Sequence, residues 1–265
     1  MSGVVAVTGA AGAIGRATVR RFLDGGWTVV GMDRDRSVEE SIGPGYRGYE
    51  IDLEDESGLE AVIEDARSAG PLRHAVGIAG GALPDEPGTQ DDPVRVSPEL
   101  FRRSIEANLT TQFVFVRSVL PWLRADPDAD RSILLTSSFN ALTGCGMPAY
   151  SAAKAGLIGM MNALTAPLGS EGIRLNVVAP GTIRTPRTER IWAADRGHFE
   201  RLEAGTALGR LGEPEDVAAA FWALATVTTH VTGEVFLVDG GQTVKRADAR
   251  QAPDDDDASG AGPSG

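Results

Sequence analysis

The feature that most constrains the fold is a glycine-rich turn near the N-terminus, between a short apolar run and a helical pattern. The apolar run Val4–Val7 predicts a buried strand. It leads into Thr8–Gly15, and a helical pattern then continues from Arg16 to Asp24 before two glycines end it. Glycine at positions 9, 12 and 15 permits a tight turn and leaves the helix N-terminus open to a pyrophosphate. This order of elements predicts an α/β fold that binds a dinucleotide.

A tyrosine and a lysine four residues apart, Tyr150 and Lys154, form the second informative feature. At this spacing the two side chains share one face of a helix. A free tyrosine has a pKa of about 10, and an adjacent ammonium favours the phenolate and lowers that pKa toward the range of an acid–base catalyst. A hydroxyl from the upstream pair Ser137 and Ser138 could hold a substrate oxygen while the proton moves. Alone, the tyrosine and lysine also fit an ordinary helix surface.

Together, the two motifs resemble those of the short-chain dehydrogenases/reductases, in their single-domain form of about 250 residues. The turn is similar to the family's Thr-Gly-x-x-x-Gly-x-Gly pattern, with Ala13 in place of the middle glycine. The resemblance covers about residues 3 to 244 and includes Asn108, Pro180-Gly181 and Val238–Gly241. It implies a Rossmann-like, doubly wound parallel sheet of about seven strands with helices on both faces.

Strand and helix patterns alternate along residues 1–245, so we expect one domain that contains both the cofactor site and the active site. From residue 246 the composition changes to Asp, Ala, Gly, Ser and Pro, and five of the residues in 246–265 are aspartates. This composition predicts an acidic, disordered tail over residues 246–265.

The resemblance assigns the catalytic roles. Tyr150 is the general acid/base of a reversible hydride transfer between a nicotinamide cofactor and a secondary alcohol or ketone. Lys154 lowers the pKa of Tyr150, and Asn108 holds a water that connects the lysine to solvent. For the serine that holds the reacting oxygen, the family's usual spacing selects Ser137, whereas the strand ends select Ser138. We favour Ser138, because loops absorb a deletion more easily than strands change register. The predicted substrate contacts are Ser138, Asn140 and Tyr150.

The acidic residue after the second predicted strand bears on the choice between NAD and NADP. Asp33 follows the run Trp27–Met32, where a dinucleotide fold meets the adenosine ribose, and a carboxylate there repels a 2′-phosphate. Arg34 could instead pair with that phosphate, but the family's NADP users usually also carry a basic residue where this chain has Gly12. We therefore expect NAD, with NADP as the alternative. The predicted cofactor-binding residues are Gly9, Ala11, Gly12, Ala13, Ile14, Gly15, Asp33, Arg34, Asp52, Leu53, Ala79, Gly80, Gly81, Tyr150, Lys154, Pro180, Gly181, Ile183 and Thr185.

Two segments should shape the substrate pocket. Residues 82–96 form a polar loop long enough to be a pocket rim, and residues 184–209 form a charged insert that could act as a lid. Arg184, Arg187 and Arg190 in the insert could meet an acidic substrate, or could form a solvated face. Before the rim, the family usually shows Asn-Asn-Ala-Gly where this chain has Gly77–Gly80, so other side chains must brace the sheet there.

The NAD-dependent oxidoreductase is the main hypothesis. An NADP-dependent carbonyl reductase of the same fold is one alternative. A sugar-nucleotide dehydratase or epimerase is another, although those relatives usually have a longer C-terminal domain. A cofactor-binding protein with little catalysis is the last.

The composition limits which binding partners and which cellular compartment we expect. The net charge of −12 opposes nucleic-acid binding. No apolar run approaches the ~18 residues of a membrane span, and no signal peptide precedes the first strand. The single cysteine, Cys145, fits a reducing compartment, and the three histidines form no metal-ligand pattern. We expect a cytoplasmic enzyme that acts on a small molecule, without a metal. Helix pairing typical of the family predicts a homotetramer or homodimer.

Overall fold

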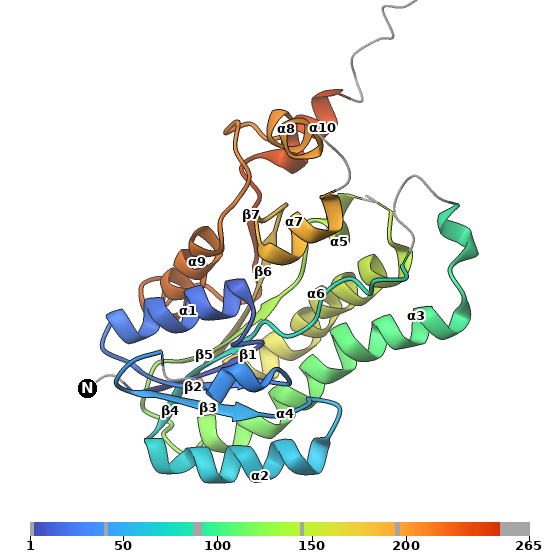
Figure 1. Ribbon diagram of the computed structural model, residues 1–265. Helices are drawn as coiled ribbons and strands as arrows, with labels where there is room; N and C mark the ends of the chain where they lie inside the picture. Colours follow the sequence, from blue (N-terminus) through green and yellow to red (C-terminus); the bar gives the residue numbers. More distant parts are fainter. Residues whose placement is uncertain (1–2, 40–41, 87–91, 144–145, 194–196, 250–265) are drawn as a thin grey trace, which may run out of the picture.

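The computed structural model describes residues 3–39, 42–86, 92–143, 146–193 and 197–249. Seven parallel strands form one sheet in the order β3-β2-β1-β4-β5-β6-β7 (Figure 1). This sheet confirms the predicted doubly wound architecture, because the strand order reverses direction between β1 and β4. The strands are β1 (Val4–Thr8), β2 (Thr28–Asp33), β3 (Tyr46–Glu50), β4 (Leu72–Gly77), β5 (Arg131–Thr136), β6 (Ile173–Pro180) and β7 (Val235–Val238).

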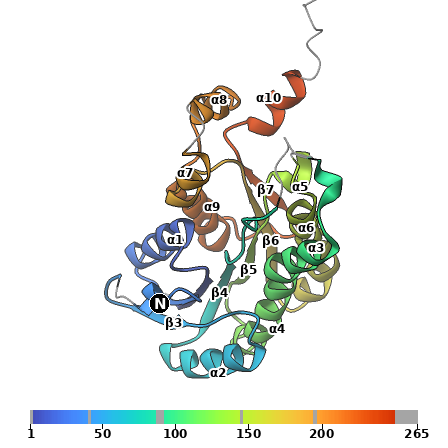
Figure 2. The same cartoon turned by 45° about the vertical axis from the view of Figure 1, so that its right-hand side comes forward.

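Helices cover both faces of the sheet (Figure 2). Helices α1 and α9 pack on one face, and α2, α4 and α6 pack on the other. The α-helices are α1 (Ala13–Asp24), α2 (Glu56–Ala66), α3 (Pro98–Ile105), α4 (Thr111–Leu123), α5 (Asn140–Thr143), α6 (Pro148–Gly169), α7 (Pro186–Trp192), α8 (His198–Ala204), α9 (Pro214–Thr226) and α10 (Gln242–Ala249). Short 3₁₀ turns lie at η1 (Arg36–Glu39), η2 (Arg67–Ala69) and η3 (Pro93–Arg95), and a π-helical turn, η4 (Glu106–Thr110), joins α3 to α4.

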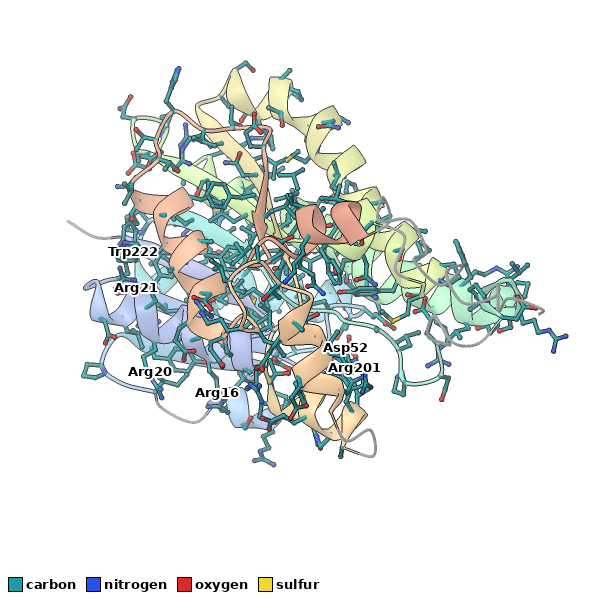
Figure 3. All side chains as sticks on the ribbon, turned by 90° about the horizontal axis from the view of Figure 1, so that it is seen from above. Arg16, Arg20, Arg21, Asp52, Arg201 and Trp222 are labelled. Atoms are coloured by element: carbon teal, nitrogen blue, oxygen red, sulfur yellow. The ribbon has the colours of Figure 1, made fainter. Side chains whose placement is uncertain are left out.

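The central strand shows why an almost continuous apolar run suits this fold. Successive side chains of a strand point to opposite faces, so both faces must be apolar when both are covered. In β1, Val4 and Ala6 join the core beneath α2, α4 and α6, whereas Val5 and Val7 join the core beneath α1 and α9. The α1–α9 contact extends to the surface, where the Arg21 guanidinium lies 4.8 Å from the ring centroid of Trp222 (Figure 3).

The C-terminal part differs from the sequence-based expectation. The last strand, β7, spans only Val235–Val238. Helix α10 then continues to Ala249, into the segment predicted as a disordered tail. Two side chains hold this helix in place. The Asp239 carboxylate accepts hydrogen bonds from the amides of residues 241 and 243, and Lys245 Nζ donates to the carbonyl of Ala204 at 2.6 Å. Residues 250–265 of the predicted tail lie outside the described residues.

The sheet places most of the predicted functional residues at one edge. The glycine turn follows β1, Asp33 ends β2, Gly80 follows β4, Ser138 follows β5 and Gly181 follows β6. In a parallel sheet these carboxyl ends lie together, and ligands of open α/β sheets bind there. Helices α7, α8 and α10 lie beyond the same edge (Figure 1). Among the residues described by the structure, no helix is long and apolar enough to cross a membrane.

Candidate active site

The glycine turn between β1 and α1 fits the diphosphate of a dinucleotide. Gly9 has φ 67°, a left-handed conformation, and a Cβ on it would lie 2.7 Å from the amide nitrogen of Ala79. A Cβ on Gly15 would overlap with the carbonyl oxygen of Gly9. No side chain caps α1 at Gly12, so the first-turn amides, which lack acceptors within a helix, are open to an anion. Ala13 is the first residue of α1, so its methyl group leaves this turn intact.

The end of β2 brings Asp33 beside the glycine turn. Asp33 Oδ2 accepts a hydrogen bond from the Ala11 amide at 3.0 Å, and its Oδ1 accepts one from the Asp35 amide at 3.0 Å. Arg34, by contrast, is exposed. The sequence analysis missed Arg16, whose Nη2 donates to Ser37 Oγ at 2.9 Å and whose Nε donates to the carbonyl of Ala11. Arg16 therefore links the glycine turn to the loop after β2.

The loop after β3 exposes Asp52 at the same edge. Within the described residues, the one hydrogen bond to its side chain comes from the Glu54 amide, which donates to Oδ1 at 3.1 Å. Asp52 does not cap the next helix, because Asp55 caps α2 by accepting the Gly58 amide at 3.0 Å. Leu53 is buried beneath the loop.

Other side chains replace the amides that the family usually carries after β4. The amide of Ala79 donates to Thr8 Oγ1 at 3.3 Å, and Gln112 Nε2 donates to the Ala79 carbonyl at 2.7 Å. Thr136 Oγ1 donates to the Gly77 carbonyl at 2.7 Å. A Cβ on Gly77 would overlap with Gln112 Oε1, so the glycine and the glutamine depend on each other. Gln112, a buried polar residue on α4, thus braces the segment that carries Ala79.

Asn108 lies in the π-helical turn between α3 and α4, and its side chain is completely buried. Its Oδ1 accepts the Gly81 amide at 2.7 Å, and its Nδ2 donates to the carbonyls of Gly81 at 3.1 Å and Ser104 at 3.0 Å. The helix is therefore irregular at Asn108, where it forms a π-turn, a feature often found at functional sites. Asn108 fixes the backbone next to Gly80, and a Cβ on Gly80 would lie 2.7 Å from its Oδ1.

The two serines after β5 point to different neighbours. Ser137 Oγ donates to the carbonyl of Lys154 at 2.7 Å and is part of the packing against α6. Ser138 Oγ accepts the Asn140 amide at 3.2 Å and interacts with the side chain of Tyr150. The structure thus brings Ser138, and not Ser137, to the phenol.

Tyr150 and Lys154 lie one turn apart on α6, at the carboxyl edge of the sheet. The ammonium of Lys154 is 5.7 Å from the centroid of the Tyr150 ring and donates to the carbonyl of Thr136 at 2.8 Å. Burial lowers the pKa of Lys154 to about 7. Burial raises the pKa of Tyr150, whereas its interaction with Ser138 lowers it. The predicted low pKa of the tyrosine is therefore wrong for this structure, because burial outweighs the groups that stabilise the phenolate.

The rim loop contributes a buried carboxylate that the sequence analysis did not single out. Glu86 Oε1 accepts the amide of Tyr150 at 2.8 Å, and its Oε2 accepts Ser104 Oγ at 3.5 Å. Helix α6 has no cap from its own N-cap residue, Met147, so Glu86 satisfies a first-turn amide from 64 positions away. No local pattern could reveal this contact, and the charge of Glu86 also raises the pKa of Tyr150.

The segment after β6 is held by backbone contacts. The Gly181 amide donates to the carbonyl of Val238 at 2.9 Å, directly after Pro180 ends β6. Buried Ile183 forms a single parallel bridge with Gly212. Thr185 caps α7, with its Oγ1 accepting the amide of residue 188 at 3.2 Å.

The three arginines of the insert have different surroundings. Arg184 pairs with Glu203 at 2.8 Å and lies 4.7 Å from the ring centroid of Phe199, so it stabilises the insert. Arg190 Nε donates to the carbonyl of Pro186 within its own helix. Arg187 reaches across to the rim loop, where its Nη2 donates to the carbonyl of Ala82.

Comparisons with known proteins identify the family. Residues 9–243 match a family model described as enoyl-(acyl carrier protein) reductase. The chain is 34% identical over 252 residues to the 3-oxoacyl-(acyl-carrier-protein) reductase FabG of Thermotoga maritima, covering 91% of this chain and 98% of that one. It is 32% identical over 246 residues to the L-fucose dehydrogenase of Mus musculus, covering 90% and 87%. A solved oxidoreductase of the short chain dehydrogenase/reductase family from Burkholderia thailandensis superposes with a TM-score of 0.83 at 34% identity, covering 94% and 96%. The chain therefore belongs to the short-chain dehydrogenases/reductases, a family of NAD(P)-binding oxidoreductases.

Proposed function

We propose that this protein is an NAD-dependent oxidoreductase that transfers a hydride reversibly between the nicotinamide and a secondary alcohol or ketone. The observation that carries the proposal is the Tyr150 side chain, which interacts with Ser138 at the carboxyl edge of the sheet and has the Lys154 ammonium 5.7 Å from its ring. When bound, the nicotinamide accepts or supplies the hydride at its C4 atom. The protein supplies the geometry and the proton.

Tyr150 carries the proton in both directions. In oxidation its phenolate takes the hydroxyl proton of the alcohol, and in reduction its phenol returns a proton to the ketone oxygen. Ser138 holds that oxygen through its hydroxyl. Protonated Lys154 stabilises the phenolate and binds the nicotinamide ribose. The side chain of Asn108 is occupied by Gly81 and Ser104, so we assign the relay water to its backbone.

Asn140 is the further proposed substrate contact. It is buried at the start of α5, two residues after Ser138, and its backbone amide donates a hydrogen bond to Ser138 Oγ at 3.2 Å. Its Nδ2 has no hydrogen-bond partner among the described residues. A buried donor without a partner carries a cost of about 1–3 kcal/mol, which a substrate oxygen would remove.

The residues around the glycine turn suit NAD. The proposed pyrophosphate site is formed by Gly9 and by the amides that begin α1. The Asp33 carboxylate, fixed by the Ala11 amide, is an acceptor for ribose hydroxyls and repels a 2′-phosphate. The competing proposal is NADP, which Arg16 favours because its guanidinium lies on Ser37 in the loop after β2.

The assembly and location belong to the same proposal. Edge strand β7 exposes Phe236 by 46% and Leu237 by 41%, and α4 exposes Phe113 by 47%, which supports a homodimer or homotetramer. We propose a cytoplasmic enzyme acting on a small molecule. Light scattering on the purified chain tests the assembly, and a monomer at micromolar concentration would contradict it.

The function is tested by measuring turnover of a panel of secondary alcohols and ketones with NAD and with NADP. The absorbance of the reduced nicotinamide is the readout. We expect turnover with NAD, and loss of about 10³-fold or more of it in Tyr150→Phe. NADH binding, measured by calorimetry, should stay within about twofold of the parent value, because the phenyl ring keeps the packing. Unchanged turnover in Tyr150→Phe refutes the proposal.

A further inference from the structure

Arg187, a residue of the insert, contacts the backbone next to the proposed active site. Its Nη2 donates to the carbonyl of Ala82, and a Cβ built on Gly81 would lie 2.5 Å from its Nη1. Gly81 is itself held by Asn108, which bonds to both its amide and its carbonyl. The guanidinium is therefore fixed against the segment that Asn108 anchors, although α7, which carries it, is far away in sequence.

The positive charge of Arg187 acts on the phenol of Tyr150. It lowers the pKa of that phenol, in the same direction as the interaction with Ser138. A charge has this effect only when it lies near the titrating group without full solvent screening. The guanidinium is consequently within electrostatic reach of the place where Tyr150 and Ser138 would hold the reacting oxygen.

Two other arginines that follow β6 have carboxylate partners. Arg184 pairs with Glu203, and Arg210 pairs with Asp216. Arg187 has no carboxylate partner among the residues that the structure describes, and its side chain is exposed. A guanidinium has five N–H donors in a planar fork, so one bond to a carbonyl leaves most of them for another acceptor.

Glu86 forms no ion pair with Arg187 among the contacts of the described residues. Glu86 also influences Tyr150, but its two carboxylate oxygens accept the Tyr150 amide and the Ser104 hydroxyl. The proposed pyrophosphate site needs no help from Arg187, since it lies at the glycine turn and the start of α1. The fitting partner for the guanidinium is therefore an anion that lies on the substrate side of Tyr150.

We propose that Arg187 binds a carboxylate of the substrate, so that the enzyme acts on a hydroxy acid or the matching oxo acid. This inference rests on the proposed function, because it places the carboxylate relative to the oxygen that Tyr150 protonates. Arginine binds carboxylates through two parallel hydrogen bonds, which orient as well as attract the ligand. The bond to Ala82 holds the fork ready for this contact.

The test compares hydroxy acids with their methyl esters, in a series that varies the spacing between hydroxyl and carboxylate. We expect the parent enzyme to favour the best acid over its ester in kcat/KM by about 10- to 100-fold, as a charge-assisted pair would give. Arg187→Ala and Arg187→Gln should bring this ratio close to one. Glutamine can keep a hydrogen bond to Ala82 without the charge, so it separates the charge from the tether. The control is Arg190→Ala on the same helix, which should leave the acid-to-ester ratio of kcat/KM unchanged.

A binding measurement covers the case in which turnover is too slow to compare. Succinate and dimethyl succinate are titrated into the NADH complex of each variant, with NADH fluorescence as the readout. We expect the parent and Arg190→Ala to bind succinate more tightly than its ester, and the Arg187 variants to lose that difference. The Kd of NADH should stay within about twofold in all of them. An unchanged preference in the Arg187 variants overturns the inference. So does a weaker NADH complex with the preference intact, which would assign the guanidinium to the cofactor.

The two proposals fail in different ways. Tyr150-dependent oxidation of neutral alcohols without any preference for acids overturns the role of Arg187 and leaves the oxidoreductase intact. Absence of hydride transfer to or from any compound overturns the oxidoreductase, and the succinate titration then decides whether Arg187 binds a carboxylate.

Discussion

The proposed cofactor side and the proposed reaction side of the candidate site are built in different ways. The cofactor side consists of backbone: a left-handed Gly9, a Gly15 with no space for a side chain, and the uncapped start of α1. The reaction side consists of side chains from distant segments, such as Glu86 on the amide of Tyr150. A backbone site arises from one short stretch of sequence. A side-chain site requires the whole fold, and it can therefore vary in substrate while the cofactor side stays the same.

The largest effect should come from the reaction side, where the two serines form a matched pair. Ser138→Ala removes the hydroxyl that contacts Tyr150, and we expect kcat/KM to fall by about 10²-fold with the Kd of NADH unchanged. Ser137→Ala removes a buried bond to the Lys154 carbonyl and should cost about 1 kcal/mol of stability with little loss of rate. Equal rate losses in both variants would contradict the assignment.

The matching change on the cofactor side is Gly15→Ala. Its methyl group would overlap with the Gly9 carbonyl, so the turn must shift. We expect about a tenfold or larger increase in the Kd of NADH and a destabilisation of about 1–3 kcal/mol. The control is Gly169→Ala, where no atom lies within 4 Å of the new methyl group. If calorimetry gave the parent Kd for Gly15→Ala, the backbone description of this side would fail.

The choice of cofactor should respond to a single charge. Asp33→Asn keeps an acceptor for the Ala11 amide but removes the negative charge, so the NAD-to-NADP ratio of kcat/KM should fall by about tenfold. Asp35→Asn, two residues along the chain, serves as the control, because its carboxylate accepts the Ser37 amide, whereas the Ala11 amide of the glycine turn donates to Asp33. A parent enzyme that prefers NADP would instead point to Arg16.

The smallest effect concerns the pH dependence of the free energy of unfolding, which should depend on Lys154 of the proposed reaction side. Burial lowers the pKa of Lys154 to about 7 from an ordinary value of 10.5, so the unfolded chain binds more protons between these pH values. Stability should therefore rise with pH from about 7 toward 10, by at most about 1.4 kcal/mol per pH unit. Urea unfolding at several pH values measures this slope, and Lys154→Met should flatten it. A slope that is the same in the parent and in Lys154→Met would show that burial does not lower the pKa of this ammonium.

Local patterns predicted the sheet well. The apolar runs of the strands identify residues that face two covered surfaces, as Val4 and Val5 show, and this alternation depends only on neighbours in sequence. The strand end also selected Ser138 over Ser137, in agreement with the hydroxyl that the structure brings to Tyr150. The catalytic role of Ser138 stays a prediction.

Long-range contacts limited the prediction of the reaction side. Glu86 and Tyr150 are 64 positions apart, and Arg187 and Ala82 are 105 apart, so no spacing rule connects them. The pKa of Tyr150 was predicted in the wrong direction because burial depends on packing that a helix pattern does not describe. Gln112 could be suspected only as a polar residue on an apolar helix, and its bond to Ala79 required the fold.

Five consecutive residues of the rim, 82–86, contact two separate helices. The Ala82 carbonyl accepts Arg187 of α7, and the Glu86 carboxylate accepts the amide of Tyr150 in α6. This short stretch thus couples the two helices, since a displacement at one end reaches Tyr150, the proposed catalytic residue, at the other. Anyone who grafts a foreign loop here to change selectivity would also disturb the tyrosine, unless the graft preserves an acid at position 86 and its distance from position 82.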